Sequence, residues 1–341
     1  MYGGWRKLKA TIKDVAKEAG VSVGTASEIL NNKGAFREET KRRVREAAER
    51  LGYRVAGVRR SLDQLKRVFV LYPEKMGDGG FTVNALYREF FEHIEQSLSN
   101  LGVNVFVAPN NTDLFPLNTA IGKGEVGGVI ALGTGERHPS LLRLLDEQVP
   151  CVSVMRMPKL ETRLSWVSVD HRRAAYDVVT HLVELGHRNI SLVTLYDDTG
   201  YMADRIDGFR QALSDYGISS GGRIINEPHL GYGGLAARLF SETPMPTAVF
   251  ASPDDLAVRV IDEARERGLR VPQDLSVVGF DDLDKAVQSS PKLTTIGYSR
   301  RSIGTMAVEA LQMVARHGVT SVGIRIPHQL IVRESCAPPQ T

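Results

Sequence analysis

The feature that most constrains the fold of this sequence is an alternation of short β-branched runs with helical stretches, which begins at Val68. Strands that alternate with helices pair in parallel, and the helices then cover both faces of the sheet. We expect strands over 68–72, 103–107, 127–132, 151–154, 167–170, 190–195, 247–250 and 275–279. We expect helices over 85–101, around 141–147, up to Gly186, and over 205–216 and 254–267. The pattern predicts an α/β protein built on parallel sheets.

The length of the chain predicts more than one sheet. Its 341 residues suffice for two or three domains, and the alternation restarts near Val167. Two similar halves of roughly 120–150 residues exceed what one small sheet holds, so we expect two lobes. Ligands of such sheets bind at the carboxyl ends of the strands.

Simple counts exclude several classes of protein. No apolar run approaches the roughly 20 residues that span a bilayer, and no apolar stretch follows the basic start, Met1–Lys9. We therefore expect a cytoplasmic protein with no secretion signal and no membrane partner. Cys151 and Cys336 are the only cysteines, which excludes a disulfide scaffold and a zinc site built on several cysteines.

The net charge of +3 conceals an asymmetry along the chain. Residues 1–67 contain 17 Lys and Arg against 8 Asp and Glu, a net charge of +9, whereas the remainder has 26 against 32, a net charge of −6. A small basic segment on a mildly acidic body is typical of a nucleic-acid-binding module joined to a second function. A solvated basic surface is the alternative.

The basic segment predicts three short helices. Thr11 and Asp14 are spaced as an approximate capping box at the start of the first helix. Gly20 ends that helix, Ser22 caps the second, and the third runs from about Glu38 to Leu51. The apolar positions with helical spacing are Ile12, Val15, Ala16 and Ala19, then Ala26, Ile29 and Leu30, then Val44, Ala47, Ala48 and Leu51.

Two short helices joined by a tight glycine turn and backed by a third form a helix-turn-helix, whose second helix enters the DNA major groove. A generic three-helix bundle is the alternative. The segment TIKDVAKEAGVSVGTASEILNN, Thr11–Asn32, resembles the DNA-binding head of the LacI/GalR family of bacterial transcription regulators. The resemblance continues through EETKRRVREAAERLGY and into RRSL, Arg59–Leu62.

The resemblance implies two groups of DNA-binding residues. Base reading falls to Val23 and Gly24 and, one turn later, to Glu28, where the family usually has arginine. A glutamate accepts from the amino group of cytosine, so we expect an operator that differs at that base; otherwise Glu28 points to solvent or pairs with a nearby lysine. Phosphate contacts, which set register without reading sequence, fall to Thr11, Ser22, Thr25, Ser27, Asn31 and Tyr53.

Residues 54–66 resemble the hinge segment of the family. There, two such segments become helical only on specific DNA and enter the minor groove side by side. Arg60 and Leu62 are the DNA-binding candidates, the leucine as a wedge between base pairs. Val55, Ala56 and Arg59 depart from the family pattern, and Gly57 weakens helix formation, so a plain basic tether that attracts phosphates remains the alternative.

Four segments of the body also resemble this family: VSVDHRRAAYDVVTHLVELGHRNISLVT, DGFRQAL, PTAVFASPDDLA and VPQDLSVVGFDD. With the head, the resemblance extends from about Thr11 to Pro338. It implies a two-lobed, periplasmic-binding-protein-like core with a cleft, in which the chain crosses between the lobes three times.

The resemblance places a polyhydroxylated effector in the cleft. Arg205 matches the family's arginine three residues before a glycine, and Asp281 matches the first aspartate of GFDD. Donors and acceptors are both needed, because each hydroxyl gives and takes a hydrogen bond. Tyr232 stands where the family often has a stacking aromatic residue. The other effector-binding candidates are Tyr87, Arg156 and Asp254.

The chain departs from the family in the cleft. Pro253 and Met155 stand where asparagine and aspartate are common, which removes two polar groups. Arg156 adds a positive charge that suits an acidic sugar or a phosphate, or else it points to solvent. Two alternatives remain: Arg205 and Asp281 form only a salt bridge between lobes, or the cleft binds nothing small.

The sequence contains no catalytic constellation. Adjacent carboxylates such as Asp197 and Asp198 point to opposite faces of a strand and make no matched acid and base. His181 and His187 have no clustered ligands, and Gly133-Thr134-Gly135 lacks the lysine of a phosphate loop. We therefore expect no enzyme activity, no catalytic or metal-binding residue and no cofactor.

These inferences predict a homodimeric repressor of transcription that binds a near-palindromic, double-stranded operator DNA and responds to a carbohydrate-like effector. We expect a helix-turn-helix domain over 1–53, a hinge over 54–66 and a two-lobed core over 67–341. The lobes are expected at about 67–166 with 297–323, and at about 167–296 with 324–341. A corepressor-dependent or ligand-independent regulator, and a solute-binding protein without a role on DNA, are the alternatives.

Overall fold

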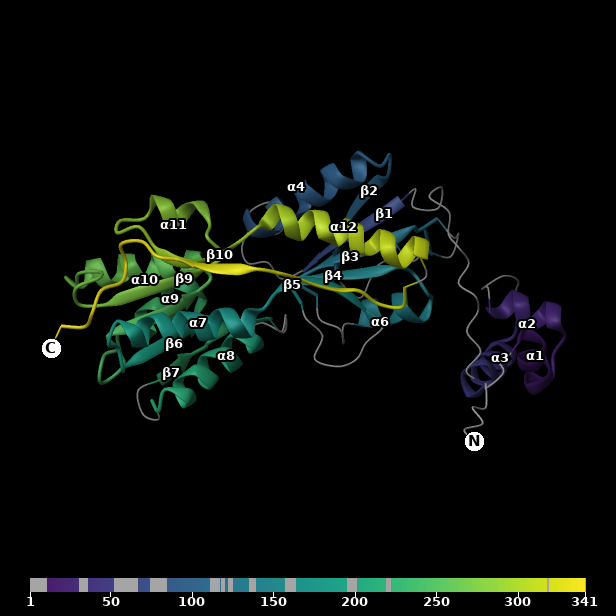
Figure 1. Cartoon of the computed structure of the whole chain (residues 1–341), viewed down its shortest axis with the longest axis horizontal. Helices are drawn as coiled ribbons and strands as arrows, with labels where there is room; N and C mark the ends of the chain where they lie inside the picture. The colour runs from purple at the N-terminus through teal and green to yellow at the C-terminus, as the bar shows by residue number, and fades with distance from the viewer. Residues whose placement is uncertain are drawn as a thin grey trace, which may run out of the picture. The chain divides into compact units, whose positions relative to one another are not determined.

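The computed structural model describes residues 11–30, 36–51, 67–73, 85–110, 117, 120–121, 125–134, 139–156, 164–194, 201–218, 222–317 and 319–340. The chain divides into two compact units, Met1–Arg60 and Ser61–Thr341. The first unit is helical where it is described, and the second contains two sheets covered by helices (Figure 1). The described helices include none that is both long and apolar enough to cross a bilayer.

The first unit consists of the three predicted helices, α1 (Ile12–Ala19), α2 (Val23–Leu30) and α3 (Glu38–Arg50). Thr11 and Asp14 form the capping box: the Thr11 N–H donates to Asp14 Oδ2 over 2.7 Å. This hydrogen bond lowers the pKa of the exposed Asp14 carboxyl, together with a second one from the Thr11 hydroxyl. The start of α1 is therefore decided by residues three positions apart.

The end of α1 is also decided locally. Gly20 has a φ of 64°, which glycine adopts without steric cost, and Arg43 Nη2 donates to the Ala19 carbonyl over 2.7 Å. The predicted core is buried at Val15, Ala16, Ala19, Ala26, Ile29, Val44, Ala47 and Ala48. The prediction for Leu51 is wrong: its side chain is 37% exposed, because α3 ends at Arg50 and its buried face stops there.

The first lobe of the second unit is built on a six-stranded, all-parallel sheet in the order β11-β5-β4-β3-β1-β2. Its strands are β1 (Arg67–Pro73), β2 (Asn104–Asn110), β3 (Gly128–Leu132), β4 (Cys151–Val154), β5 (Ser165–Val169) and β11 (Gly323–Ile326). Its helices are α4 (Ala85–Ser99), α6 (Pro139–Asp146) and α12 (Arg300–His317).

The second lobe repeats this plan with the order β12-β10-β9-β8-β6-β7, in which only β12 is antiparallel. Its strands are β6 (Ile190–Thr194), β7 (Gly222–Ile225), β8 (Ala248–Ser252), β9 (Ser276–Phe280), β10 (Thr294–Tyr298) and β12 (His328–Ile331). Its helices are α7 (His171–Glu184), α8 (Tyr201–Asp215), the 3-10 turn Pro228–Leu230, α9 (Gly231–Leu239), α10 (Asp254–Glu266) and α11 (Asp284–Gln288).

Helices cover both faces of each sheet, as the alternation predicted. In β1, Val68 and Val70 pack with α4 and α12, whereas Phe69 and Leu71 pack with α6, because neighbouring residues of a strand point to opposite faces. Figure 1 shows α4 and α12 side by side on one face of the first sheet. In the second lobe α7 and α8 cover one face, and α9 and α10 the other.

The chain crosses between the lobes three times: from β5 into α7, from β10 into α12, and from β11 into β12. Neither lobe is therefore one continuous segment. The first-lobe sheet runs to Val169 and resumes with a strand that ends at Ile326.

Several element bounds differ from the prediction, and the predicted ranges lack β7, α9, α11, β10, α12, β11 and β12. Two of the differences in bounds have a clear local cause. The α8 helix begins at Tyr201 rather than Arg205, because Met202 and Ile206, four residues apart, extend its buried face by one turn. Asp170 lies beyond β5, since its side chain accepts a hydrogen bond from the Arg173 N–H and caps α7.

We predict that Gly208→Ala destabilises the chain. A methyl group at Gly208 in α8 would lie less than 3.0 Å from the Arg172 carbonyl oxygen in α7, so the two helices would have to separate. We expect a loss of about 1–3 kcal/mol in the free energy of unfolding, measured by urea titration. Gly233→Ala in α9 is the matched control, because nothing lies within 4 Å of its added methyl group. An equal loss in both variants would contradict this account.

Candidate nucleic-acid interface and effector site

The predicted base-reading residues share the exposed side of α2. Val23 is 43% exposed, and Gly24 and Glu28 are also exposed, whereas Ala26 and Ile29 are buried against α1 and α3. Gly24 and Glu28 lie one helical turn apart, so they face the same way. The buried side anchors the helix, and the exposed side is left to a partner.

The start of α2 is held by a hydroxyl pair. Ser22 Oγ accepts from the Thr25 N–H over 2.9 Å, and the two hydroxyls lie 2.9 Å apart. Thr11 and Ser22 are exposed, and Thr25 and Ser27 are half-buried. Thr11, Ser22 and Thr25 lie at the N-termini of α1 and α2, where backbone N–H groups favour anions, and Ser27 lies in the second turn of α2. Asn31, Tyr53, Arg60 and Leu62 lie outside the described residues.

Glu28 has no ion-pair partner in the described part of the chain. The acidic side chains of this unit that do pair are Glu38 with Lys41, Glu46 with Arg42, and Glu18 with Arg50. An unpaired carboxylate on the exposed side of α2 can accept a hydrogen bond from a base.

The two principal effector candidates lie together in the second lobe. Arg205 is 1% exposed and Asp281 is 2% exposed, and Arg205 Nη2 lies 3.4 Å from Asp281 Oδ1. Arg205 also donates to Ser252 Oγ from Nη1 and to His171 Nδ1 from Nε over 3.3 Å. Its guanidinium carbon lies 3.5 Å from the centre of the Phe280 ring. With Met202 Sδ, 3.8 Å from Nη1, four hydrogen-bonding partners surround this buried cation, together with the rings of Phe280 and Tyr201.

These partners meet because the sheet is parallel. Ser252 ends β8, Asp281 follows β9, and Tyr298 ends β10. The carboxyl ends of neighbouring parallel strands lie at one edge of a sheet, which is where ligands of such folds bind. Sequence reasoning missed His171, Ser252 and Tyr298 as partners of the pair. Ser252 and Tyr298 share one signal, a polar residue at the end of a buried strand, whereas His171 is the first residue of α7.

Burial determines the protonation of two members of this cluster. Burial and the neighbouring Asp281 hold the pKa of the Tyr298 hydroxyl well above its usual value, so that the hydroxyl stays protonated and donates to Asp281 Oδ1 over 2.7 Å. Burial and the charge of Arg205 hold the pKa of His171 well below its usual value. The neutral ring can then accept the hydrogen bond from Arg205 Nε.

Asp254, a further effector candidate, makes its hydrogen bonds inside the second lobe. It is completely buried, and its two oxygens accept from the Leu283 N–H over 2.8 Å and from the Thr295 hydroxyl over 2.6 Å. Burial, with the nearby Asp281, raises the pKa of Asp254 to about 8. In this structure Asp254 joins α10 to the segment after β9 and to β10.

The remaining candidates lie on separate elements. Tyr87 of α4 is buried, with its hydroxyl against the backbone of Gly133 at the end of β3. Arg156 follows β4, is half-buried, and lies close enough to His171 to lower its pKa. Tyr232 is 36% exposed in the first turn of α9, a helix that packs against α10. The described residues include no group of three or more side chains suited to a metal ion.

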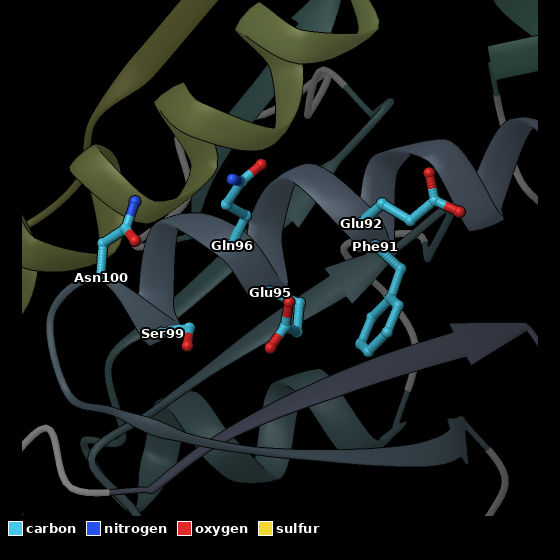
Figure 2. A pocket seen from close by; sticks show the side chains of 6 residues that line it. All are labelled: Phe91, Glu92, Glu95, Gln96, Ser99 and Asn100. Carbon is cyan, nitrogen blue, oxygen red and sulfur yellow. The ribbon is translucent and has the colours of Figure 1, made fainter.

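A separate hollow of about 450 Å³ lies on the surface of α4. Figure 2 shows the side chains that line it along one side of the helix: Phe91, Glu92, Glu95, Gln96, Ser99 and Asn100. Its lining is mainly acidic and amide groups with one aromatic ring, and it contains none of the predicted effector residues.

Two protein families match this chain. Residues 11–55 match "Bacterial regulatory proteins, lacI family", and residues 179–336 match "Periplasmic binding protein-like domain". Catabolite control protein A of Priestia megaterium is 31% identical over 96% of this chain and 99% of that protein. The HTH-type transcriptional repressor CytR of Escherichia coli K12 is 30% identical over 97% of each chain.

Solved structures share the fold over almost the whole chain. The complex of the transcriptional regulator CelR with cellobiose has a TM-score of 0.70 and 26% identity, and the match covers 96% of this chain and 99% of that one. The lac repressor dimer bound to operator and the anti-inducer ONPF has a TM-score of 0.68 and 23% identity, over 97% of this chain and 100% of that one.

We predict that Asp254 makes stability fall as pH rises. Its pKa is 3.8 in an ordinary setting and about 8 in the folded chain. Between these pH values Asp254 keeps its proton in the folded chain and loses it in the unfolded chain. The contribution of Asp254 to the free energy of unfolding is therefore complete below pH 4 and is lost as pH rises to 8. The slope is at most about 1.4 kcal/mol per pH unit.

Urea unfolding at pH 5, 6 and 7 measures this effect. Asp254→Asn removes the titrating group, so wild type should lose stability relative to this variant as pH rises. Asp255→Asn, which removes the neighbouring carboxylate paired with Lys285, is the control. Parallel pH profiles for wild type and Asp254→Asn would show that Asp254 ionises normally in the folded chain.

Proposed function

The chain belongs to the lacI family of bacterial regulatory proteins, and from this premise we propose that it is a homodimeric repressor controlled by a carbohydrate effector that binds at Arg205 and Asp281. Its DNA-binding head and effector-binding core make it a transcription regulator. One observation carries the effector proposal: a buried arginine and a buried aspartate meet at the carboxyl ends of parallel strands.

We propose that α2 enters the major groove of the operator. Its exposed side carries Val23, Gly24 and Glu28, which can reach base edges, and its first turn brings hydroxyls towards the phosphates. The phosphate contacts we propose are Thr11, Ser22, Thr25, Ser27, Asn31 and Tyr53, with Arg60 and Leu62 in the minor groove. Two heads, one per subunit, would read two halves of a near-palindrome. The functional division we propose remains 1–53, 54–66 and 67–341.

Glu28 is the residue that we propose sets operator choice. A carboxylate accepts hydrogen bonds but donates none when ionised, so it favours the amino group of cytosine over the oxygen and nitrogen acceptors of guanine. Its freedom from ion pairs in the described part of the head supports this role.

A sugar suits the cluster around Arg205 because its hydroxyls both donate and accept. Asp281 offers a carboxylate and Arg205 offers donors, and Tyr298 holds the carboxylate of Asp281 in place. We include Tyr87, Arg156, Tyr232 and Asp254 among the effector-binding residues that we propose. The structural relative CelR has been solved with cellobiose, which supports a carbohydrate as the class of ligand.

A solute-binding protein with no role on DNA is the competing function. The helix-turn-helix head argues against it, because such a protein has no use for a base-reading helix. The relatives are named as control proteins and repressors, and we propose no enzymatic activity. We also propose a cytoplasmic location, where operator DNA lies.

We predict that replacing Glu28 changes base preference at a single position of each half-site. Selection from random DNA with wild type and Glu28→Ala should show a loss of preference worth about 1–3 kcal/mol at that position. Thr11→Ala is the control: a lost phosphate contact weakens binding to all sequences alike. If Glu28→Ala keeps the wild-type preference at every position, the carboxylate reads no base.

We predict that a sugar or sugar derivative raises the melting temperature of the full chain. The panel is cellobiose, glucose, ribose, gluconate and glucose 6-phosphate, which separates neutral from anionic ligands. At 100 times its dissociation constant, a ligand stabilises the native state by about 2.7 kcal/mol. Arg205→Lys and Asp281→Asn should abolish the shift. Arg223→Lys is the control and should keep it, because Arg223 pairs with Glu242 at the surface, outside the cluster. A shift that survives both cluster variants would place the ligand elsewhere.

A further inference from the structure

Arg300 makes contacts with both lobes at the point where the chain passes from β10 into α12. Its Nη1 donates to the carbonyl oxygens of Asp281, over 2.7 Å, and Asp282, over 3.2 Å, in the second lobe. Its Nε donates to a carboxylate oxygen of Glu89, which lies on α4 of the first lobe. One planar guanidinium therefore joins the segment after β9 to a helix of the other lobe.

The segment that Arg300 holds has an unusual backbone. Asp281 has a φ of 107° and Asp282 a φ of 51°, conformations that a residue with a Cβ atom rarely adopts. The side chains are restrained as well: Asp281 binds Arg205 and Tyr298, and Asp282 Oδ1 accepts from Arg333 Nη2 over 2.6 Å. Such a backbone persists only where its surroundings hold it, so the loss of one restraint should change it.

Asp281 thus contacts the effector cluster and Arg300 through different atoms. Its carboxylate lies in the buried cluster with Arg205, and its carbonyl oxygen accepts from Arg300. A group that competes for the carboxylate would disturb the same residue whose carbonyl is bound by Arg300. A rearrangement in the cluster can therefore reach Arg300 through a single residue.

The first-lobe end of this connection is closely packed. A methyl group at Gly304 in α12 would lie less than 3.0 Å from His93 Cβ, and 3.2 Å from the Phe90 carbonyl oxygen in α4. Because α4 and α12 are in such close contact, Arg300 and Glu89 have little freedom to move apart without moving the helix. The same helix carries the surface hollow of Figure 2.

We propose that Arg300 is a positioning residue that couples Asp281 in the effector cluster to α4 in the first lobe. The proposal rests on the proposed function in one respect, since effector binding is the event that this coupling would transmit. Arg300 holds the Asp281 and Asp282 carbonyls with one nitrogen and Glu89 with another. If Arg300 couples the two sites, a change confined to the effector cluster alters the local stability of α4 only while Arg300 is present.

Amide hydrogen exchange of the full chain tests this coupling without DNA or effector. Asp281→Asn disturbs the cluster, and the readout is the exchange of the α4 amides, residues 85–99. In the wild-type background we expect Asp281→Asn to speed this exchange about tenfold. In an Arg300→Met background, where α4 already exchanges faster, the same substitution should add less than about twofold. Equal acceleration in the two backgrounds would overturn the proposal.

Two further variants separate coupling from a general loss of stability. Arg301→Met, at the exposed neighbouring residue, should preserve the wild-type response to Asp281→Asn. Glu89→Gln keeps Arg300 and breaks only its first-lobe contact, so it should reproduce Arg300→Met, whereas Glu92→Gln should not. The α10 amides of the second lobe should be unaffected by Glu89→Gln. Faster exchange throughout the chain in Glu89→Gln would mean that the ion pair is merely structural.

The hydrogen-exchange experiment and the sugar-binding test have independent outcomes. A chain that binds no sugar can still show non-additive exchange in α4, which would support the coupling and refute the effector. A chain that binds sugar through Arg205 and Asp281 but shows additive exchange would keep its proposed effector and lose this role for Arg300.

Discussion

The burial of the Arg205 guanidinium is the constraint on which the second lobe depends. Removing a cation from water costs several kcal/mol, which only well-placed hydrogen bonds and an opposite charge offset. Here those groups come from the start of α7 and from the ends of β8 and β9. The parallel strand order brings these points together, because it gathers the carboxyl ends of the strands at one edge. The burial of Arg205 therefore depends on the strand order of this sheet.

The same constraint links the second lobe to the first. The carboxylate that balances Arg205 belongs to Asp281, and the backbone of Asp281 is held by Arg300 at one of the three crossings between lobes. If each lobe were one continuous segment, the chain would cross between the lobes at fewer places, and fewer residues could lie at a crossing. Interleaved lobes let one residue take part in a ligand cluster and in an interlobe contact, which is what a reciprocal coupling between sites needs.

The structure of the head depends mainly on contacts between residues that are close in the sequence. The capping box at Thr11 and Asp14, the left-handed Gly20 and the hydroxyl pair at Ser22 and Thr25 each involve residues no more than three positions apart, or a single residue. A short helix with one buried side leaves its other side to a partner. The carboxylate of Glu28 lies on that side, where we propose that it sets the choice of operator.

The sequence by itself determined much of the strand and helix alternation, the caps of the head, and, through family resemblance, the choice of Arg205 and Asp281 as effector candidates. These follow from periodicity, from capping chemistry at short spacing and from motifs that stand in order. It did not show that Ser252, His171 and Tyr298 would surround the pair, that Asp254 would be sealed by Leu283 and Thr295, or that Arg300 would join Asp281 to Glu89. Those contacts join residues far apart along the chain, and only the strand order and the packing of helices across the lobes decide which distant residues meet.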